Sequence, residues 1–183
     1  DLHRIVYQNN RKEYLRLDLN ENPGGLPQEF IDEVLNDITP KFVSQYPETL
    51  EFENCLAKFL NVNNDNLCLV NGSSEGIRHI IEAFSAPGGK IVGVVPSYAM
   101  YQVYAQMYGR EFIQVKYNDD LTISADTIID ALSEDVDLLV LLNPNNPVGN
   151  AYSNEEFEKI LEAAKKYEIT ILVDEAYMYL SLI

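Results

Sequence analysis

The chain of 183 residues is long enough to bury a sizeable core, and one domain or one lobe of a larger protein is the expected organisation. Its net charge of −16, from 13 basic and 29 acidic residues, argues against nucleic acids and anionic membranes as partners, because both need clustered lysine and arginine. No stretch approaches the roughly 20 apolar residues of a membrane span. The polar start DLHRIVYQNNRKEY predicts no signal peptide, so a soluble cytoplasmic protein is expected by default.

The first third of the sequence predicts an irregular arm followed by two helices. Residues 1–27 end in the turn-rich sequence NENPGGLP, which is typical of an arm without regular structure. Apolar residues then recur with helical spacing from Pro27, and the Thr39-Pro40 step ends this helix, because a residue before proline avoids the helical conformation. A second helix is predicted over residues 48–60.

The sequence contains two cysteines, Cys55 and Cys68. Their spacing matches neither a CxxC motif nor a metal site, and two cysteines make a disulfide framework a poor interpretation. We expect both to be buried, reduced thiols, and we expect no metal site.

Strands and helices alternate from residue 66 onward. The predicted order is strand 66–70, helix 73–89, strand 90–96, helix 97–109, strand 110–117, helix 124–134, strand 136–142, helix 153–167 and strand 168–178. Because the strands are apolar enough for burial on both faces, the pattern predicts a three-layer α/β/α fold with a largely parallel sheet. In such sheets ligands bind beyond the carboxyl ends of the strands, so the segments after each strand are the candidate site.

The segment NGSSEG follows the first predicted strand. Gly72 permits a tight turn, and Ser73 and Ser74 stand at a helix start, where free N–H groups and the helix dipole favour an anion such as phosphate. The alternative is an ordinary N-cap without a ligand.

The segment PSYAMY follows the second predicted strand. Tyr98 would stand near the same edge of the sheet, where an aromatic ring can stack on a flat ligand. The alternative is that Tyr98, Tyr101 and Tyr104 only fill one face of a helix.

The segment NPNNPVG follows strand 136–142 and places Asn145 and Asn146 where a core strand ends. Each asparagine side chain donates and accepts hydrogen bonds, and the two flanking prolines stiffen the turn that carries them. The segment therefore predicts an amide held in place for a ligand, with a plain turn as the alternative.

The segment DEAY follows the apolar run ITILV. Asp174 would lie at the end of a buried strand, where a carboxylate is costly unless it is paired, and Tyr177 adds a phenol nearby. A cation on a ligand or a structural arginine would resolve that cost.

These groups together are an anion site, a stacking ring, an oriented amide, a buried carboxylate and a phenol, and the predicted sheet places all of them at one edge. A flat, cationic, phosphorylated heteroaromatic ligand would use every one of them. Pyridoxal phosphate fits this description, because its ring nitrogen needs an acidic partner to stay protonated.

The segments LDLNENP, QYPE, NGSSEGI, PSYAMY, NPNNPVG and DEAY occur in this order over nearly the whole chain. With them the sequence resembles the fold-type I pyridoxal-phosphate enzymes and, among these, the histidinol-phosphate aminotransferase group. The resemblance implies a pyridoxal-phosphate-dependent aminotransferase that exchanges an amino group between an amino acid or amino-alcohol phosphate and a 2-oxo acid.

The resemblance also implies a role for each matching residue. Asp174 would bind the pyridinium nitrogen, Tyr177 and Asn146 would bind the phenolic oxygen of the ring, and Tyr98 would stack on the ring. The phosphate would be held by Ser73 and Ser74 together with the amide of Glu75.

Two further roles lie in the N-terminal part. The resemblance implies that Tyr46 reaches the cofactor phosphate of a neighbouring subunit in a homodimer, and that Asn22 lies near the substrate. Residues 1–40 would form an arm and first helix with small-domain and dimer contacts, and residues 41–183 the cofactor-binding large domain.

One departure from the family pattern concerns catalysis. The lysine that carries the cofactor lies downstream of DEAY in this family, whereas Lys165 and Lys166 precede Asp174 on a predicted helix. We therefore assign no catalytic residue, and expect that the sequence is the front half of an enzyme and that residues 1–183 alone are inactive and poorly soluble.

Two alternatives to an aminotransferase remain open on the sequence. The ring-binding residues are shared with decarboxylases that act on a phosphorylated amino acid such as threonine phosphate. The second alternative is a non-catalytic protein that keeps the fold only for binding. The intact NPNNPVG and DEAY segments weigh against this alternative.

Overall fold

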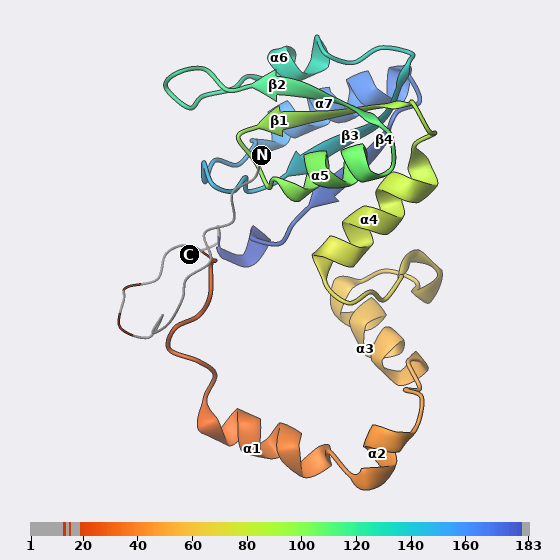
Figure 1. The fold of residues 1–183 in the computed structure, drawn as a ribbon, viewed down its shortest axis with the longest axis vertical. Coiled ribbons are helices and arrows are strands. Elements are labelled where there is room, and N and C mark those ends of the chain that lie inside the picture. The colour runs from red at the N-terminus through yellow and green to blue at the C-terminus, as the bar shows by residue number, and fades with distance from the viewer. Residues whose placement is uncertain (1–12, 14, 16–18, 181–183) are drawn as a thin grey trace. The chain divides into compact units, whose positions relative to one another are not determined.

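The computed structural model describes residues 13, 15 and 19–180 and divides into two compact units, residues 1–67 and residues 68–183 (Figure 1). Most of the predicted arm lies outside the described residues, and residues 19–27 contain only turns and bends, as expected. In the described ranges, no helix combines the length and the apolar character that crossing a bilayer would require.

The first unit consists of short helices. They are α1 (Gln28–Asp37), α2 (Pro40–Ser44), α3 (Leu50–Leu60) and the 3-10 helix η2 (Asn64–Asn66). The predicted helix end at Thr39-Pro40 is confirmed, but the same step also starts α2, which the sequence did not predict. The Thr39 side chain accepts a hydrogen bond of 3.1 Å from the Phe42 amide, and Pro40 occupies the first helical position, where its missing N–H costs nothing.

The prediction of buried thiols is wrong, because Cys55 and Cys68 are both exposed and unpaired. Cys55 lies on α3, and across the described helices α1, α2 and α3 only Ala57 is buried. Cys68 lies in a segment that no described strand covers. Burial of a thiol requires apolar side chains packed around it, and the described residues provide no such core at Cys55 or Cys68.

The second unit contains a sheet that is parallel, as predicted, with four of the five predicted strands. Its strands are β1 (Lys90–Val95), β2 (Glu111–Lys116), β3 (Val136–Leu142) and β4 (Thr170–Asp174), in the order β2-β1-β3-β4. The central strand β3 has the bounds expected from its apolar run, and all its residues except Asp137 are buried. A parallel sheet with such a strand must be covered on both faces.

Helices cover the two faces of the sheet (Figure 1). They are α4 (Ser73–Phe84), α5 (Met100–Met107), α6 (Ala125–Ile129) and α7 (Asn154–Lys166), and the 3-10 helix η3 (Met178–Leu180) follows β4. One core cluster packs Ile128 of α6 and Ile160 of α7 against Leu139 and Leu141. The other packs Ile81 and Tyr101 of α4 and α5 against the opposite side of the sheet. The three-layer α/β/α architecture is therefore confirmed.

Side-chain caps start two of these helices, as the sequence indicates. Ser124 accepts a hydrogen bond of 3.2 Å from the Thr127 amide at the start of α6. Ser153 and Glu156 form the predicted reciprocal capping box of α7.

The predicted strand 66–70 is wrong. Leu67 has extended dihedral angles, but residues 67–70 form no ladder, and the sheet of the described residues contains no neighbour for them. A strand exists only where a second strand satisfies its backbone groups, and an apolar run cannot show whether that partner is present.

Gly93 in the middle of β1 provides a test of core packing. A Cβ at this position would stand 2.6 Å from Cζ of Phe112 on β2. Gly93→Ala is therefore expected to destabilise the protein by about 1–3 kcal/mol, because the packed ring must move. Gly76→Ala on α4, where the new Cβ would stand 3.4 Å from Val70, is the control and should be neutral or slightly stabilising. Equal midpoints of thermal unfolding for the two variants would contradict the packing.

Candidate functional site

The carboxyl ends of β3 and β4 meet at one edge of the sheet. Leu142 and Asp174 are paired in the register of the two strands, and the Asn143 amide donates a hydrogen bond of 2.9 Å to the Asp174 carbonyl oxygen. The segments that carry NPNNPVG and DEAY therefore leave the sheet side by side. We call this edge, with the segment after β1 and the start of α4, the rim.

Asp174 is a buried carboxylate with neutral partners. Its residue is 8% exposed, Oδ2 accepts a hydrogen bond of 2.7 Å from the Tyr101 hydroxyl, and Oδ1 accepts one of 3.0 Å from the Ala176 amide. Among the residues that the structure describes, no lysine or arginine forms an ion pair with Asp174. The structural arginine considered as an alternative is therefore absent from the described residues around Asp174. A cationic group on a ligand would offset the cost of burying this carboxylate.

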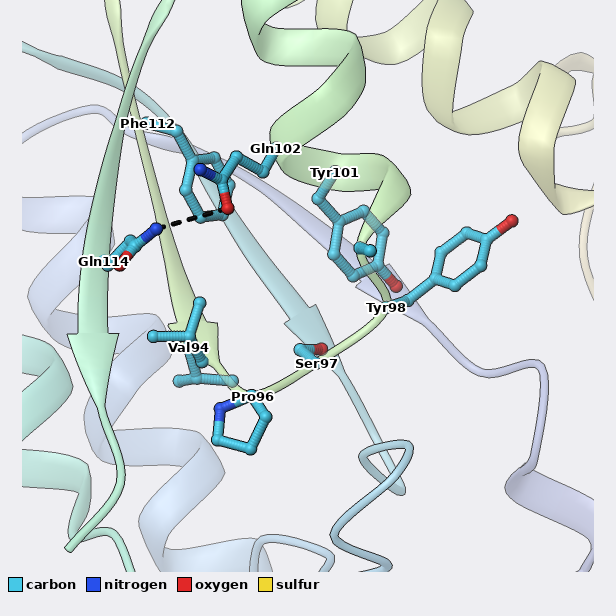
Figure 2. Close-up of a pocket in the computed structure, with 10 residues that line it drawn as sticks. Val94, Pro96, Ser97, Tyr98, Tyr101, Gln102, Phe112 and Gln114 are labelled. Atoms are coloured by element: carbon cyan, nitrogen blue, oxygen red, sulfur yellow. Dashed lines mark hydrogen bonds between the residues drawn. The ribbon is translucent and has the colours of Figure 1, made fainter. Parts of the chain in front are cut away.

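The sequence indicated Tyr101 only as a residue that fills one face of a helix. Its hydrogen bond to Asp174 was not predicted. Burial, and after it the hydrogen bond to Asp174, raise the pKa of the Tyr101 phenol, so the hydroxyl stays protonated and donates. The available signal was its spacing of one helical turn from Tyr98, which places two rings on the same face. Their ring centroids are 5.5 Å apart in an edge-to-face arrangement (Figure 2).

Tyr98 also connects Tyr101 and Asp174 to α4. Its hydroxyl shares a hydrogen bond of 3.1 Å with Ser74 Oγ. Ser74, Tyr98, Tyr101 and Asp174 thus form a continuous series of contacts, although the first and last of them are far apart in the sequence. The rim is one structure and not a set of separate loop ends.

The start of α4 offers two amide donors. Gly72 has a φ of 82°, a conformation that favours glycine, and precedes the helix. The Glu75 amide donates to the Gly72 carbonyl at 3.2 Å, and the Glu75 carboxylate accepts from the Asn71 amide at 2.6 Å, which lowers the pKa of Glu75. For the N–H groups of Ser73 and Ser74 no acceptor is found within the described part of the chain. An anion at this helix start would meet these two amides before that of Glu75.

A cleft of about 280 Å³ separates α4 from the end of β4. Ser73 and Asp174 are both among the residues that line it, so the start of α4 and the end of β4 border one space. Its walls include Ile77, Ile80 and Leu172, which give an apolar surface for a ring between the two polar ends.

Asn146 and Tyr177, the other two residues expected on the ring, also lie on the rim. Both are half-buried. Tyr177 packs against the core cluster that contains Leu172 and Tyr101. Asn146 directly follows Asn145, whose buried side chain the sequence did not assign to any contact.

Tyr46 and Asn22 lie in the first unit. Tyr46 is 98% exposed. The Asn22 side chain closes a turn. It donates a hydrogen bond of 2.8 Å to the Gly25 carbonyl oxygen and accepts one of 3.1 Å from the Gly24 amide. Their expected roles stay predictions.

A second cavity, of about 240 Å³, lies between the start of α5 and strands β1 and β2 (Figure 2). Tyr98 and Tyr101 line this cavity, and Gln114 donates a hydrogen bond of 3.2 Å to Gln102, which also lines it. Neither tyrosine lines the cleft between α4 and β4, although Tyr101 reaches Asp174 through its hydroxyl.

Tyr101→Phe removes the hydroxyl donor of Asp174 and is expected to cost about 1.5–3 kcal/mol of stability, the usual range for a hydrogen bond to a charged group. Tyr104→Phe is the matched control, because this ring is also buried on α5 and its hydroxyl forms no hydrogen bond with the described residues. Thermal unfolding of both variants measures the difference. Equal midpoints would show that the Tyr101 contact contributes nothing.

The fold and the rim define a class of protein: a doubly covered parallel α/β unit whose cleft suits a flat ligand with an anionic group at one end and a positive charge at the other. Residues 12–182 match the family model Aminotransferase class I and II. The chain belongs to this family.

The chain is similar to several named relatives. It is 35% identical over 170 residues to the histidinol-phosphate aminotransferase of Chlorobaculum tepidum, with 91% of this chain and 48% of that protein covered. It is 30% identical over 177 residues to the enzyme of the same name from Thermococcus gammatolerans, with 96% and 49% covered. The solved structure of the histidinol-phosphate aminotransferase from Clostridium acetobutylicum matches with a TM-score of 0.72 and 31% identity, over 85% of this chain and 45% of that one. The chain thus spans about half the length of the relatives it matches.

Proposed function

We propose that the protein is a pyridoxal-phosphate-dependent aminotransferase of the histidinol-phosphate or aromatic amino acid type. The observation that carries the proposal is the cleft between α4 and β4, with open amides at one end and a carboxylate that neutral donors hold at the other. Family membership and the named relatives support it.

The donor set fits pyridoxal phosphate. Ser73 and Ser74 would hold the phosphate with amides and hydroxyls, and the Glu75 amide would add a donor only by giving up Gly72. Asp174 would bind the ring nitrogen, whose positive charge would give the carboxylate a cationic partner that the described residues do not supply. Tyr98 would stack on the ring.

Bound pyridoxal phosphate supplies an electron sink through its protonated ring. Asp174 holds that proton at the ring nitrogen, and Tyr101 keeps the carboxylate in place by donating to Oδ2. Asn146 and Tyr177 would orient the ring by hydrogen bonds to its phenolic oxygen. The apolar residues Ile77 and Leu172, which line the same cleft, would limit the access of water around a bound ring, and this would strengthen the charge interaction at Asp174.

The remaining roles extend the proposal beyond the second unit. Asn22 would lie near the substrate, and Tyr46 would reach the phosphate site of a neighbouring subunit, so the active unit would be a homodimer. Residues 1–40 would make small-domain and dimer contacts, and residues 41–183 would hold the cofactor. The high exposure of Tyr46 leaves its ring available for such a contact. A cytoplasmic location stays a prediction.

Activity of the full-length protein tests the proposal. With pyridoxal phosphate and a 2-oxo acid, histidinol phosphate and the aromatic amino acids should serve as amino donors, and the amino acid formed from the 2-oxo acid is the product to measure. Release of CO2 from a phosphorylated amino acid, without amino transfer, would instead identify a decarboxylase. The absence of both reactions would contradict the proposal.

A further inference from the structure

Asn145 joins three segments of the rim through its side chain. The residue is 2% exposed. Its amide nitrogen donates a hydrogen bond of 2.9 Å to the Pro96 carbonyl oxygen and one of 3.0 Å to the Tyr117 hydroxyl. Its amide oxygen accepts 2.7 Å from the Ser97 hydroxyl. Pro96 and Ser97 follow β1, Tyr117 follows β2, and Asn145 follows β3, so one side chain connects the loops after three neighbouring strands.

The backbone of Asn145 is fixed as well. Its backbone N–H donates a hydrogen bond of 2.8 Å to the Asn150 carbonyl oxygen, and its backbone carbonyl oxygen accepts one of 2.6 Å from the Gly149 amide. Gly149 has a φ of 84°, a left-handed conformation that a side chain would strain. The turn is therefore closed on itself while its buried amide reaches the adjacent loops.

The contacts demand an asparagine at this position. Two donors and one acceptor are used together, which a carboxylate or a hydroxyl cannot reproduce. Burial raises the pKa of the Tyr117 phenol, so this hydroxyl stays protonated, donates 2.8 Å to Asn150 Oδ1 and accepts from Asn145. A satisfied buried network of this kind holds its members in one arrangement.

Two of the three loops that Asn145 connects continue into a residue of the proposed site. Ser97 is followed by Tyr98, and Asn145 is followed by Asn146. The side chain of Asn145 therefore links the backbone next to Tyr98 with the backbone next to Asn146.

We propose that Asn145, with Tyr117 and Ser97, is a positioning residue that fixes Tyr98 and Asn146 relative to each other. The inference rests on the proposed function, because it concerns how the same site is held. A displacement of about 1 Å in such a site costs up to about a hundredfold in rate, and supporting residues are what prevent it.

The test uses the full-length protein and pyridoxamine 5′-phosphate, which carries the same ring and phosphate but binds without a covalent link. Asn145→Ala is expected to weaken its binding at least about tenfold and to change the circular dichroism that the protein induces in the bound ring, since that signal follows the orientation of the ring. Tyr117→Phe removes a single oxygen, is the variant less at risk of misfolding, and should change both readings in the same direction by a smaller amount.

Ser85→Ala is the matched control. Ser85 is also buried and hydrogen-bonded, to the Ile81 carbonyl and to Arg110, but it lies at the end of α4 away from the rim. This variant should lower the unfolding temperature and leave the affinity and the induced signal as in the wild type.

A double-mutant cycle with Tyr98→Leu separates positioning from general stability. If Asn145 acts through Tyr98, the combined variant loses less affinity than the product of the two single losses. Independent losses, or wild-type affinity and an unchanged induced signal in both Asn145→Ala and Tyr117→Phe, would overturn the inference alone. If the wild-type protein binds neither pyridoxamine phosphate nor pyridoxal phosphate, the proposed function fails together with it.

Discussion

Replacement of Asp174 with asparagine is expected to lower the kcat/KM of the full-length protein about a thousandfold, or about 4 kcal/mol of transition-state stabilisation. The carboxylate is buried, and its partners among the described residues are neutral, so its charge is available to the ring nitrogen of the cofactor. Asparagine keeps the shape and loses the charge that holds the ring protonated. Steady-state kinetics with histidinol phosphate or an aromatic donor measures the effect.

Asp137→Asn is the matched control for this substitution. Asp137 lies on the adjacent strand β3, near its opposite end, where its carboxylate accepts 2.8 Å from the Ala86 amide. The change should affect stability slightly and activity less than about threefold, which is the scale of a lost surface contact. Comparable losses of activity in the two variants would show that Asp174 acts through stability and not through its charge.

Ser73→Asp is expected to weaken cofactor binding by about a hundredfold or more while it stabilises the protein. Ser73 is the exposed first residue of α4, and a carboxylate there gains about 0.3–1 kcal/mol from the helix dipole. The same charge would repel the phosphate and compete with it for the open amides. Ser73→Ala removes only a hydroxyl donor and should cost about tenfold, in line with a hydrogen bond to a charged group. Titration with pyridoxal phosphate and thermal unfolding are the two measurements.

Asn154→Asp places the same charge at the same position of another helix. Asn154 is the exposed first residue of α7, away from the cleft. It should stabilise the protein to a similar degree and leave cofactor affinity unchanged. If Ser73→Asp binds pyridoxal phosphate as tightly as the wild type, the phosphate does not lie at the start of α4.

The parts of the fold that the sequence predicted are those in which a local pattern decides the structure. The buried run Val136–Leu142 has the same bounds in the structure, and Ser153 and Glu156 cap α7 as expected. Both depend on residues within a few positions of one another. The same holds for the alternation of strands and helices, which is enough to specify the parallel sheet.

The failures concern partners that are distant in the sequence. Residues 66–70 have strand composition but no neighbouring strand among the described residues, and the two cysteines lie outside the core that their burial would need. Pro40 was interpreted as the end of the preceding helix. It is also the first residue of α2, because proline disfavours a helix before it but is tolerated in the first turn of a helix that follows.

The candidate site divides in the same way. Asp174 lies at the end of a buried strand and the serines at the start of α4, as predicted, because such positions are recognisable in sequence. Tyr101 and Asn145 were missed, because their contacts join residues 73 and 48 positions apart and exist only in the folded sheet. The residues that we propose as ligand-binding are therefore recognisable in the sequence, whereas the contacts of Tyr101 and Asn145 appear only in the structure.

The most direct test is a crystal structure of the full-length protein with pyridoxal phosphate. We predict that the ring nitrogen lies within about 3 Å of a carboxylate oxygen of Asp174, the distance of a charge-assisted hydrogen bond. The phosphate should lie at the start of α4, against the amides of Ser73 and Ser74. Pyridoxal phosphate bound elsewhere, or no binding at saturating concentration, would contradict the assignment of the cleft between α4 and β4 as its site.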